Sequence, residues 1–458
     1  MKFIFLFLLL IFSITFLQVQ VQGLHTDTET SSPIIFDQDY TIEKFLTGLQ
    51  YPTAMDFSEN GMFVLEKNSG KIFHININQD KNIKLVLDLS VTSFAESGLL
   101  GIAVAEEKYV YLFFSQAEYD KWGLDENTRD VVYRYTWNGN ELVNPILIKS
   151  FDGHHTRHHG GVMTADKANN VYVFKGDGDS KSIYQNYPDS NNFESGIFKI
   201  DSNNSVELYA MGVRNSFGLA IDPVTQNLWE TENGEGTYDE INMVYEKFNG
   251  GWALNIGPSY RSDSKISNNL DRINDSEFQD YSYSDPKFSW YDTVGPTTIA
   301  FPNFISFEKY KDWLFVGSTN FGEIYKFQLD VERDDFIFYD TNLSKDLVLD
   351  LKDSSNEIIF ATIPGIITDI KFNDDGMYVV HYSDGIIYRI YPKEFDSTKT
   401  LAIISEDKID DKEKELIVSL EELDFFTLLS QGKIIEASDS IYSLIERNYY
   451  AMLNYLFS

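Results

Sequence analysis

Short runs of alternating apolar and polar residues recur along most of this chain, which is typical of half-buried β-strands. In six places two such runs flank a polar turn containing Gly, Asn, Asp or Lys, which indicates a β-hairpin. The hairpins cover residues 53–66, 101–114, 161–177, 218–234, 298–317 and 367–385. Further strands are expected in the gaps, at 70–75, 131–137, 196–201, 322–329 and 385–390.

A repeat of several tens of residues, built on one hairpin formula, is the pattern of a propeller blade. Six copies therefore predict an all-β fold, a six-bladed β-propeller over residues 40–392. Two packed sheets in a β-sandwich are the alternative, although a sandwich does not require one repeated formula.

The two ends of the chain differ in composition from this repeated region. Residues 1–23 combine Lys2, an apolar run and small residues near Gly23, which predicts a signal peptide, and 24–39 read as a linker. An uncleaved membrane anchor is the alternative, but the run is shorter than the roughly 20 residues that span a bilayer. Residues 393–458 are predicted to form an acidic helical tail, because apolar residues there recur mostly at steps of three, four or seven.

Composition narrows the function. The sequence has 71 acidic and 37 basic residues, a net charge of −34, so nucleic acid and anionic lipid are excluded as partners and cations are favoured. It has no cysteine, hence no disulfide and no thiolate chemistry. With the predicted signal peptide, this indicates a secreted or periplasmic protein without other membrane insertion.

The segment "HHTRHHGG", residues 154–161, concentrates four of the seven histidines and is the first candidate for chemistry. It is consistent with a catalytic base, with a metal site built from His154, His155 and His158, or with a polar loop. A base that titrates near neutral pH suits the oxidation of a hydroxyl. Asp177, at the end of the next predicted strand, could hold the other nitrogen of such an imidazole.

Several motifs occur in the order found in one family: "GLQYPTAMDF", "ESGLLGIAV", "HHGG…VYVFKGD", "GVRNSFGLAID" and "ENGEGTYDEIN…NGGW". From about Phe45 to Pro392 the chain resembles the soluble glucose/sorbosone dehydrogenases that depend on pyrroloquinoline quinone (PQQ), which are six-bladed propellers. The resemblance implies oxidation of an aldose to a lactone by hydride transfer to PQQ, with a small-molecule sugar as substrate and an external electron acceptor.

The resemblance also assigns roles to individual residues. His158 takes the place of the general base, oriented by Asp177, and His154, His155 and His159 are expected to be polar loop residues. Arg214 would stabilise the developing oxyanion and contact the quinone. The remaining cofactor and Ca²⁺ positions are, for the quinone, Asn215, Asn233 and Thr293, and for the metal, Gly234, Glu235, Asp239 and Glu240. Asp239 and Glu240 could instead cap a connection between blades, and Glu96 is expected to face the central funnel.

This chain departs from the family where the cofactor carboxylates are bound. Asn320, Ile366 and Thr368 replace one lysine and two arginines, and only Lys175 or Arg157 could compensate. Each lost charge-assisted hydrogen bond costs on the order of 1.5–3 kcal/mol. The alternative to an enzyme is therefore a degenerate, non-catalytic propeller that binds carbohydrate or a protein partner.

Overall fold

The computed structural model of the chain describes residues 32–77, 81–116, 127–179, 195–261, 263–264, 280–350 and 353–393. The predicted signal peptide, the first half of the predicted linker and all but the first residue of the predicted helical tail lie outside these residues. The described residues belong to one compact unit, which the contacts delimit at Met1–Glu394. No helix among them is long and apolar enough to cross a membrane.

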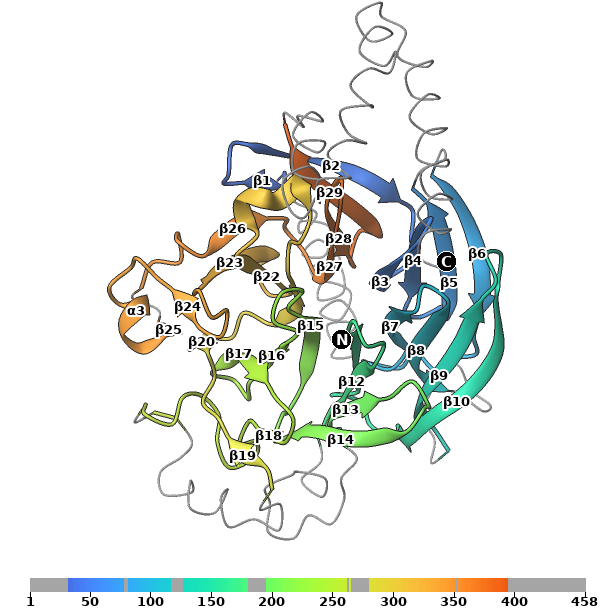
Figure 1. The fold of residues 1–458 in the computed structure, drawn as a ribbon, viewed down its shortest axis with the longest axis horizontal. Helices are drawn as coiled ribbons and strands as arrows, with labels where there is room; N and C mark the ends of the chain where they lie inside the picture. Colours follow the sequence, from blue (N-terminus) through green and yellow to red (C-terminus); the bar gives the residue numbers. More distant parts are fainter. Residues whose placement is uncertain are drawn as a thin grey trace, which may run out of the picture. The chain divides into compact units, whose positions relative to one another are not determined.

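The described strands form six sheets (Figure 1). The first contains β3 (Pro52–Ser58), β4 (Gly61–Glu66), β5 (Lys71–Asn76) and β6 (Asn82–Asp88). The second contains β7 (Leu99–Ala105), β8 (Tyr109–Gln116), β9 (Arg129–Trp137) and β10 (Leu142–Asp152). Both are antiparallel meanders in chain order.

The next two sheets carry extra strands at their outer edges. One contains β11 (Gly160–Ala165), β12 (Val171–Lys175), β13 (Gly196–Ile200), β14 (Val206–Met211), β18 (Phe248–Asn249) and β19 (Ser282–Tyr283). The other contains β15 (Ser216–Ile221), β16 (Leu228–Glu232), β17 (Asp239–Val244), β20 (Phe288–Trp290) and β25 (Val348–Leu349).

The last two sheets include the N-terminal strands. One contains β21 (Pro296–Ala300), β22 (Trp313–Ser318), β23 (Glu323–Leu329), β26 (Ile359–Thr362) and β1 (Ile34–Ile35), with β24 (Phe336–Ile337) also paired to β23. The other contains β27 (Ile367–Asn373), β28 (Gly376–His381), β29 (Ile386–Pro392) and β2 (Tyr40–Thr47). Two short helices, η2 (Ile305–Tyr310) and α3 (Leu343–Asp346), lie in connections.

The innermost strands close a ring. β3 contacts β7, β7 contacts β11, and the contacts continue through β15, β21 and β27 back to β3. β2 pairs with β29, so a strand from the start of the described chain completes the sheet that ends it (Figure 1). All six predicted hairpins are observed, and the predicted all-β propeller is confirmed.

The core lies between neighbouring sheets. Phe63 and Leu65 of the first sheet pack with Leu99 and Leu112 of the second, and each of these four side chains is fully buried. β4 is buried at every position, because it has a sheet on each side. A central strand buried on both faces loses the simple alternation that an exposed sheet would show.

Neighbouring inner strands are held together by side-chain hydrogen bonds to the backbone of the next sheet. Thr297 donates to the carbonyl of Ile367 (2.7 Å), Thr368 to that of Pro52 (3.2 Å), and Thr53 to that of Leu99 (2.9 Å). Carboxylates also join neighbouring inner strands, by accepting hydrogen bonds from backbone amides of the next strand. Asp369 accepts the Met55 amide at 2.8 Å, and Asp56 accepts the Val104 amide at 2.7 Å.

We predict that Thr297→Val, which removes one of these bonds without changing side-chain shape, lowers the free energy of unfolding by about 1–3 kcal/mol. The reason is that the buried Ile367 carbonyl loses its side-chain donor. Urea denaturation measures the effect. Thr164→Val is the control, because Thr164 is a half-buried residue of another inner strand with no such bond to a described residue. Equal losses in the two variants would contradict the prediction.

Candidate active site

His158 lies in a loop immediately before β11, and its imidazole is fixed by a buried carboxylate. Its Nδ1 is 2.6 Å from Oδ1 of Asp177, which follows β12. The other oxygen of Asp177 accepts the indole N–H of Trp252 at 2.8 Å, and the Asp179 amide donates to Oδ1 at 2.9 Å. Because Asp177 accepts these bonds, Nδ1 of His158 carries the proton, and Nε2 is left with a lone pair.

The backbone of His158 is held in an uncommon conformation. Its φ is +58°, in the left-handed region, and Gly160 and Gly161 after it also have positive φ. The His158 amide donates to Oε2 of Glu96 at 2.5 Å, and its carbonyl accepts the Gly178 amide at 3.3 Å. A Cβ on Gly176 would lie 2.0 Å from the His158 carbonyl oxygen, so that position requires glycine.

His159 lies in the predicted loop, and its ring is part of a buried hydrogen-bond network. Its Nδ1 is 2.8 Å from Oδ2 of Asp130, and its Nε2 is 2.9 Å from the carbonyl oxygen of His155. Although burial alone would raise the pKa of Asp130, the charges of His159 and Lys175 lower it to about 2. Both ring nitrogens of His159 therefore face acceptors, which an imidazolium with two N–H groups satisfies.

The two cations expected to compensate for the missing basic residues both have carboxylate partners, and only Lys175 is buried with its partner. Lys175 is 1 % exposed and lies 3.2 Å from Asp130, so its ammonium is committed inside the protein. Arg157 forms an exposed ion pair with Asp179 at 2.6 Å. His154 is exposed in the same loop, as predicted for a polar loop residue. Among the described residues, no group of three His, Asp or Glu could hold a metal ion.

Arg214 lies near His158, because its guanidinium packs over the indole of Trp252, which donates to Asp177. Its guanidinium carbon is 5.4 Å from the ring centre of Trp252. One of its N–H groups donates to the carbonyl of Asn233 at 2.8 Å, and the same nitrogen is 3.4 Å from that of Gly234. The Asn233 amide group in turn donates to Pro296 at 2.9 Å. His158, Asp177 and Arg214 are thus joined through Trp252, a residue that sequence analysis did not single out.

Two further residues predicted to bind the cofactor have different surroundings. Asn215 is 5 % exposed, and its Oδ1 has no hydrogen-bond partner among the described residues, which leaves a buried acceptor next to Arg214 in the sequence. The Thr293 carbonyl accepts the side-chain amide of Asn320 at 2.9 Å. Asn320 therefore fixes the loop of Thr293, at a position where the family has a cation.

The predicted metal ligands are occupied by hydrogen bonds. Asp239 accepts the Gly234 amide on one oxygen and the amides of Val294 and Gly295 on the other. Oε1 of Glu240 accepts the Gly257 amide at 2.6 Å. Gly234 and Glu235 lie in the loop before β17, and Glu235 is exposed. Of the two roles predicted for Asp239, that of organising a connection matches its contacts, and that of an available metal ligand does not.

Glu240 belongs to a row of buried carboxyl groups on β16 and β17. Glu232 pairs with Glu240 across the strands, and Glu230 pairs with Asn242, whose amide bonds Glu230 at 2.7 Å. Burial is the main cause that raises the pKa of Glu230 to about 8 and that of Glu240 to about 7, and it also raises the pKa of Glu232. These groups therefore retain protons near neutral pH.

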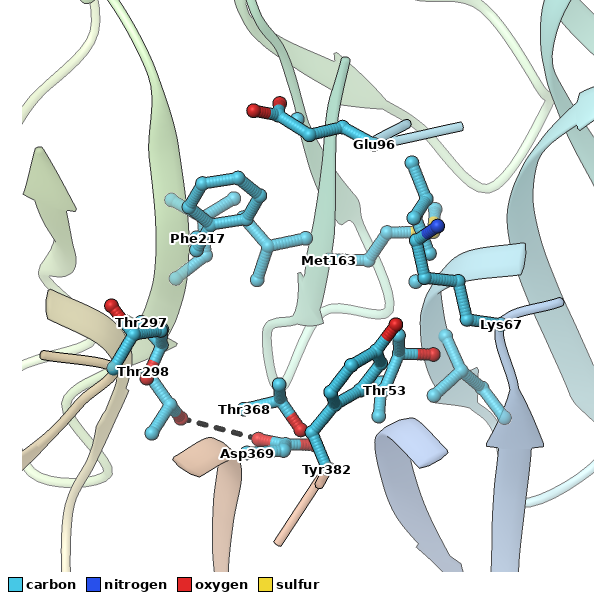
Figure 2. Close-up of a pocket in the computed structure, with 18 of the residues that line it drawn as sticks. Thr53, Lys67, Glu96, Met163, Phe217, Thr297, Thr298, Thr368, Asp369 and Tyr382 are labelled. Carbon is cyan, nitrogen blue, oxygen red and sulfur yellow. Dashed lines mark hydrogen bonds between the residues drawn. The ribbon is translucent and has the colours of Figure 1, made fainter. Parts of the chain in front are cut away.

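A cavity of about 310 Å³ lies among the inner strands (Figure 2). It is bounded by Asn233, by Gly160 just after His158 and His159, and by Glu96, whose carboxylate accepts the His158 amide. The prediction that Glu96 faces the funnel is thus matched by its place in the cavity wall. Ile366 and Thr368, which stand where the family resemblance predicts arginines, also line the cavity. Asn320 does not line it, but its neighbour Thr319 does.

Sequence analysis missed Asp130 and Trp252. Both lie far along the chain from the residues they contact, outside the motifs quoted for the site except for the last residue of "NGGW". Asp130 lies at the start of β9, and no motif in the sequence marks it as a residue of the site. Only the final tryptophan of that motif gave a signal that could have been used.

Comparison with known proteins agrees with the fold and the motif order. The sequence profile of the Glucose / Sorbosone dehydrogenase family matches residues 49–389. Aldose sugar dehydrogenase YliI of Escherichia coli is 32 % identical over 133 residues, which cover 29 % of this chain and 32 % of that protein. Quinoprotein glucose dehydrogenase B of Acinetobacter calcoaceticus is 22 % identical over 264 residues, 50 % of this chain and 55 % of that one.

A solved structure is also similar. The PQQ-bound aldose sugar dehydrogenase of Streptomyces coelicolor superposes with a TM-score of 0.55 at 17 % identity, covering 77 % of this chain and 98 % of that chain. At this identity the superposition establishes the fold alone. The family profile spans most of the chain and all six sheets, and on that basis the chain belongs to the glucose/sorbosone dehydrogenase family.

Proposed function

We propose that the protein is a quinoprotein dehydrogenase that oxidises an aldose at its hydroxyl-bearing anomeric carbon to the lactone, with PQQ as cofactor. The observation that carries this proposal is the chain of contacts from His158 through Asp177 and Trp252 to Arg214. It joins a base to a cation beside a cavity. We assign one propeller blade to each of the six sheets, and we propose export through the N-terminal segment.

In this proposal His158 removes the hydroxyl proton of the sugar. Its Nδ1 proton is held by Asp177, so Nε2 accepts the proton from substrate, and the carboxylate stabilises the imidazolium that results. The N–H groups of Trp252 and Asp179 hold Asp177 in place. His158 is buried at the end of the loop, next to Gly160, which lines the cavity.

The residues present fit the ring system of a quinone. The cavity is within the size range of cofactor pockets, and much of its wall is apolar, including Phe217 and Leu100. Asn233 lines the cavity and supplies a polar contact there, and its carbonyl is held by Arg214, which lies next to the cavity wall. When bound, the quinone supplies a two-electron acceptor for the hydride of the sugar. Arg214 stabilises negative charge that develops beside it.

Calcium has no step in this mechanism, because the donor set does not fit it. Ca²⁺ requires six to eight oxygen ligands, usually ionised carboxylates and carbonyls. The Asp239 carboxylate accepts three backbone amides, which reduces what it offers to a cation, and the Gly234 carbonyl lies 3.4 Å from a nitrogen of Arg214. Glu240, with its raised pKa, is partly protonated near neutral pH.

The alternative, a propeller that binds carbohydrate or a protein without turnover, is favoured by one observation. Lys175 is committed to a buried ion pair with Asp130, so it does not replace a missing family cation, and Arg157 pairs with Asp179 at the surface. Activity measurements on the base variants below separate the two functions.

We predict that His158→Gln lowers kcat/KM for aldose oxidation by about 10²–10⁴-fold while the melting temperature changes little. Asp177→Asn should lower kcat by on the order of 10²-fold with a small change in KM, because the imidazole loses its orienting acceptor. Dye reduction by PQQ-loaded protein measures both. His154→Ala is the control and should retain full activity. If it lost as much activity as His158→Gln, the assignment of the base would be wrong.

We predict that EDTA leaves the melting temperature unchanged, because the carboxylates of the Asp239 loop are satisfied by N–H donors. Differential scanning fluorimetry with and without chelator tests this. A fall in melting temperature that added calcium reverses would show that the loop binds the ion.

The buried row of glutamates predicts a dependence of stability on pH. The folded-state pKa values of Glu230 and Glu240 lie above the value of about 4.3 for a free glutamate. Their contribution to stability is therefore fully present below that value and is lost as pH rises through about 7 and 8. Glu230→Gln should become more stable relative to wild type as pH rises from 5 to 8, in urea titrations at each pH. A difference that is constant with pH would refute this assignment.

A further inference from the structure

The charged groups in the cavity wall are all occupied. The lysines among the lining residues are Lys67 and Lys371. The Lys67 ammonium donates to the carbonyls of Ala95 (2.9 Å) and Ser97 (2.6 Å) and to the side chain of Asn68 (3.4 Å), which uses all three N–H groups. Burial lowers the pKa of Lys67 to about 8, because the ammonium is partly removed from water. A ligand that covered this ammonium further would make its charge less favourable.

Two carboxylates, Asp369 and Asp56, oppose the single positive charge of Lys371. Its ammonium lies 4.0 Å from Asp369, and Asp369 and Asp56 both raise its pKa against the effect of burial. The cavity wall therefore carries two ammonium groups against Glu96 and Asp369, with Asp56 beside them. The local charge is zero or negative, on a chain whose net charge is −34.

Four of the threonine hydroxyl groups in the wall present acceptors rather than donors, whereas the hydroxyl group of Tyr382, which also lines the cavity, can donate. The protons of Thr53, Thr297 and Thr368 are donated to the carbonyls of neighbouring inner strands, and that of Thr298 goes to Asp369. What these hydroxyl groups can offer to a ligand is their lone pairs. A carboxylate, which only accepts hydrogen bonds, finds no partner in them.

The part of the wall around Ile366 is apolar and aromatic. The Tyr382 ring lies 5.3 Å from that of Tyr51, and the Tyr382 amide donates to the Ile366 carbonyl. Figure 2 shows Tyr382, Thr368 and Asp369 together at one end of the cavity, with Glu96 at the other. Burying an anion without a partner in such surroundings is costly, whereas an ester or a ring edge is accepted.

We propose that this cavity selects against anionic substituents, and that the protein binds its quinone cofactor more tightly when the carboxylates are replaced by uncharged groups. The inference rests on the proposed function, since it assumes that a quinone is the ligand. It identifies Ile366 as the residue that sets this preference, because Ile366 lines the cavity and is only half-buried.

The test is isothermal titration of the full chain with PQQ and with its trimethyl ester, which has the same rings without the three charges. The ester should bind at least about tenfold more tightly, because each unpaired carboxylate forgoes a charge-assisted hydrogen bond. Equal affinity, or tighter binding of the acid, would overturn the inference and leave the proposed function intact. If neither bound, both would fail.

Ile366→Arg adds a cation to the wall and should reverse the order, improving the affinity for PQQ about tenfold or more while the ester gains nothing. Ile366→Met is the matched control of similar size without charge and should keep the wild-type order. Thermal melts establish that each variant is folded. If Arg and Met at this position had the same effect on both ligands, charge at Ile366 would not set the preference.

Discussion

Closure of the ring of inner strands is the constraint on which the rest of this structure depends. These strands belong to different sheets, so no continuous backbone ladder joins them. Side-chain bonds from Thr53, Thr297 and Thr368 to the next strand, and from amides to Asp56 and Asp369, take the place of that ladder. The same groups form the cavity wall, so the requirement of closure also decides which hydrogen-bonding groups remain for a ligand.

The candidate active site depends on the ring in a second way. At one point two inner strands approach so closely that no side chain fits between them. A Cβ on Gly101 of β7 would lie 1.8 Å from the carbonyl oxygen of Gly161 on β11. The loop that carries His158 ends just before this contact, and the buried pair of Asp130 and His159 holds its last residue in place. The base is therefore positioned by backbone packing and by ions that do not meet substrate, as pre-organised sites require.

The sequence predicted the hairpins well because each depends on alternation and a local turn, which are properties of adjacent residues. It predicted that His158 and Asp177 serve one site, and they lie 2.6 Å apart. It named Lys175 as a possible partner of the cofactor carboxylates, whereas that lysine pairs with Asp130, and it did not predict that His159 also contacts Asp130. Those errors share one cause, since Asp130 comes from a neighbouring sheet, and contacts between sheets leave no periodic trace in the sequence.

What the sequence determined by itself is the strand pattern, the repeat, the absence of thiol chemistry and the presence of a histidine, an aspartate and an arginine in recognisable motifs. The tertiary structure alone decided which charges are free. Two lysines in the cavity wall and one beside the base are present in the sequence as potential ligands, yet each ammonium is occupied by acceptors brought from other strands. The physical reason is that a buried charge must find its partner within about 3–4 Å, and that distance is set by packing rather than by sequence order.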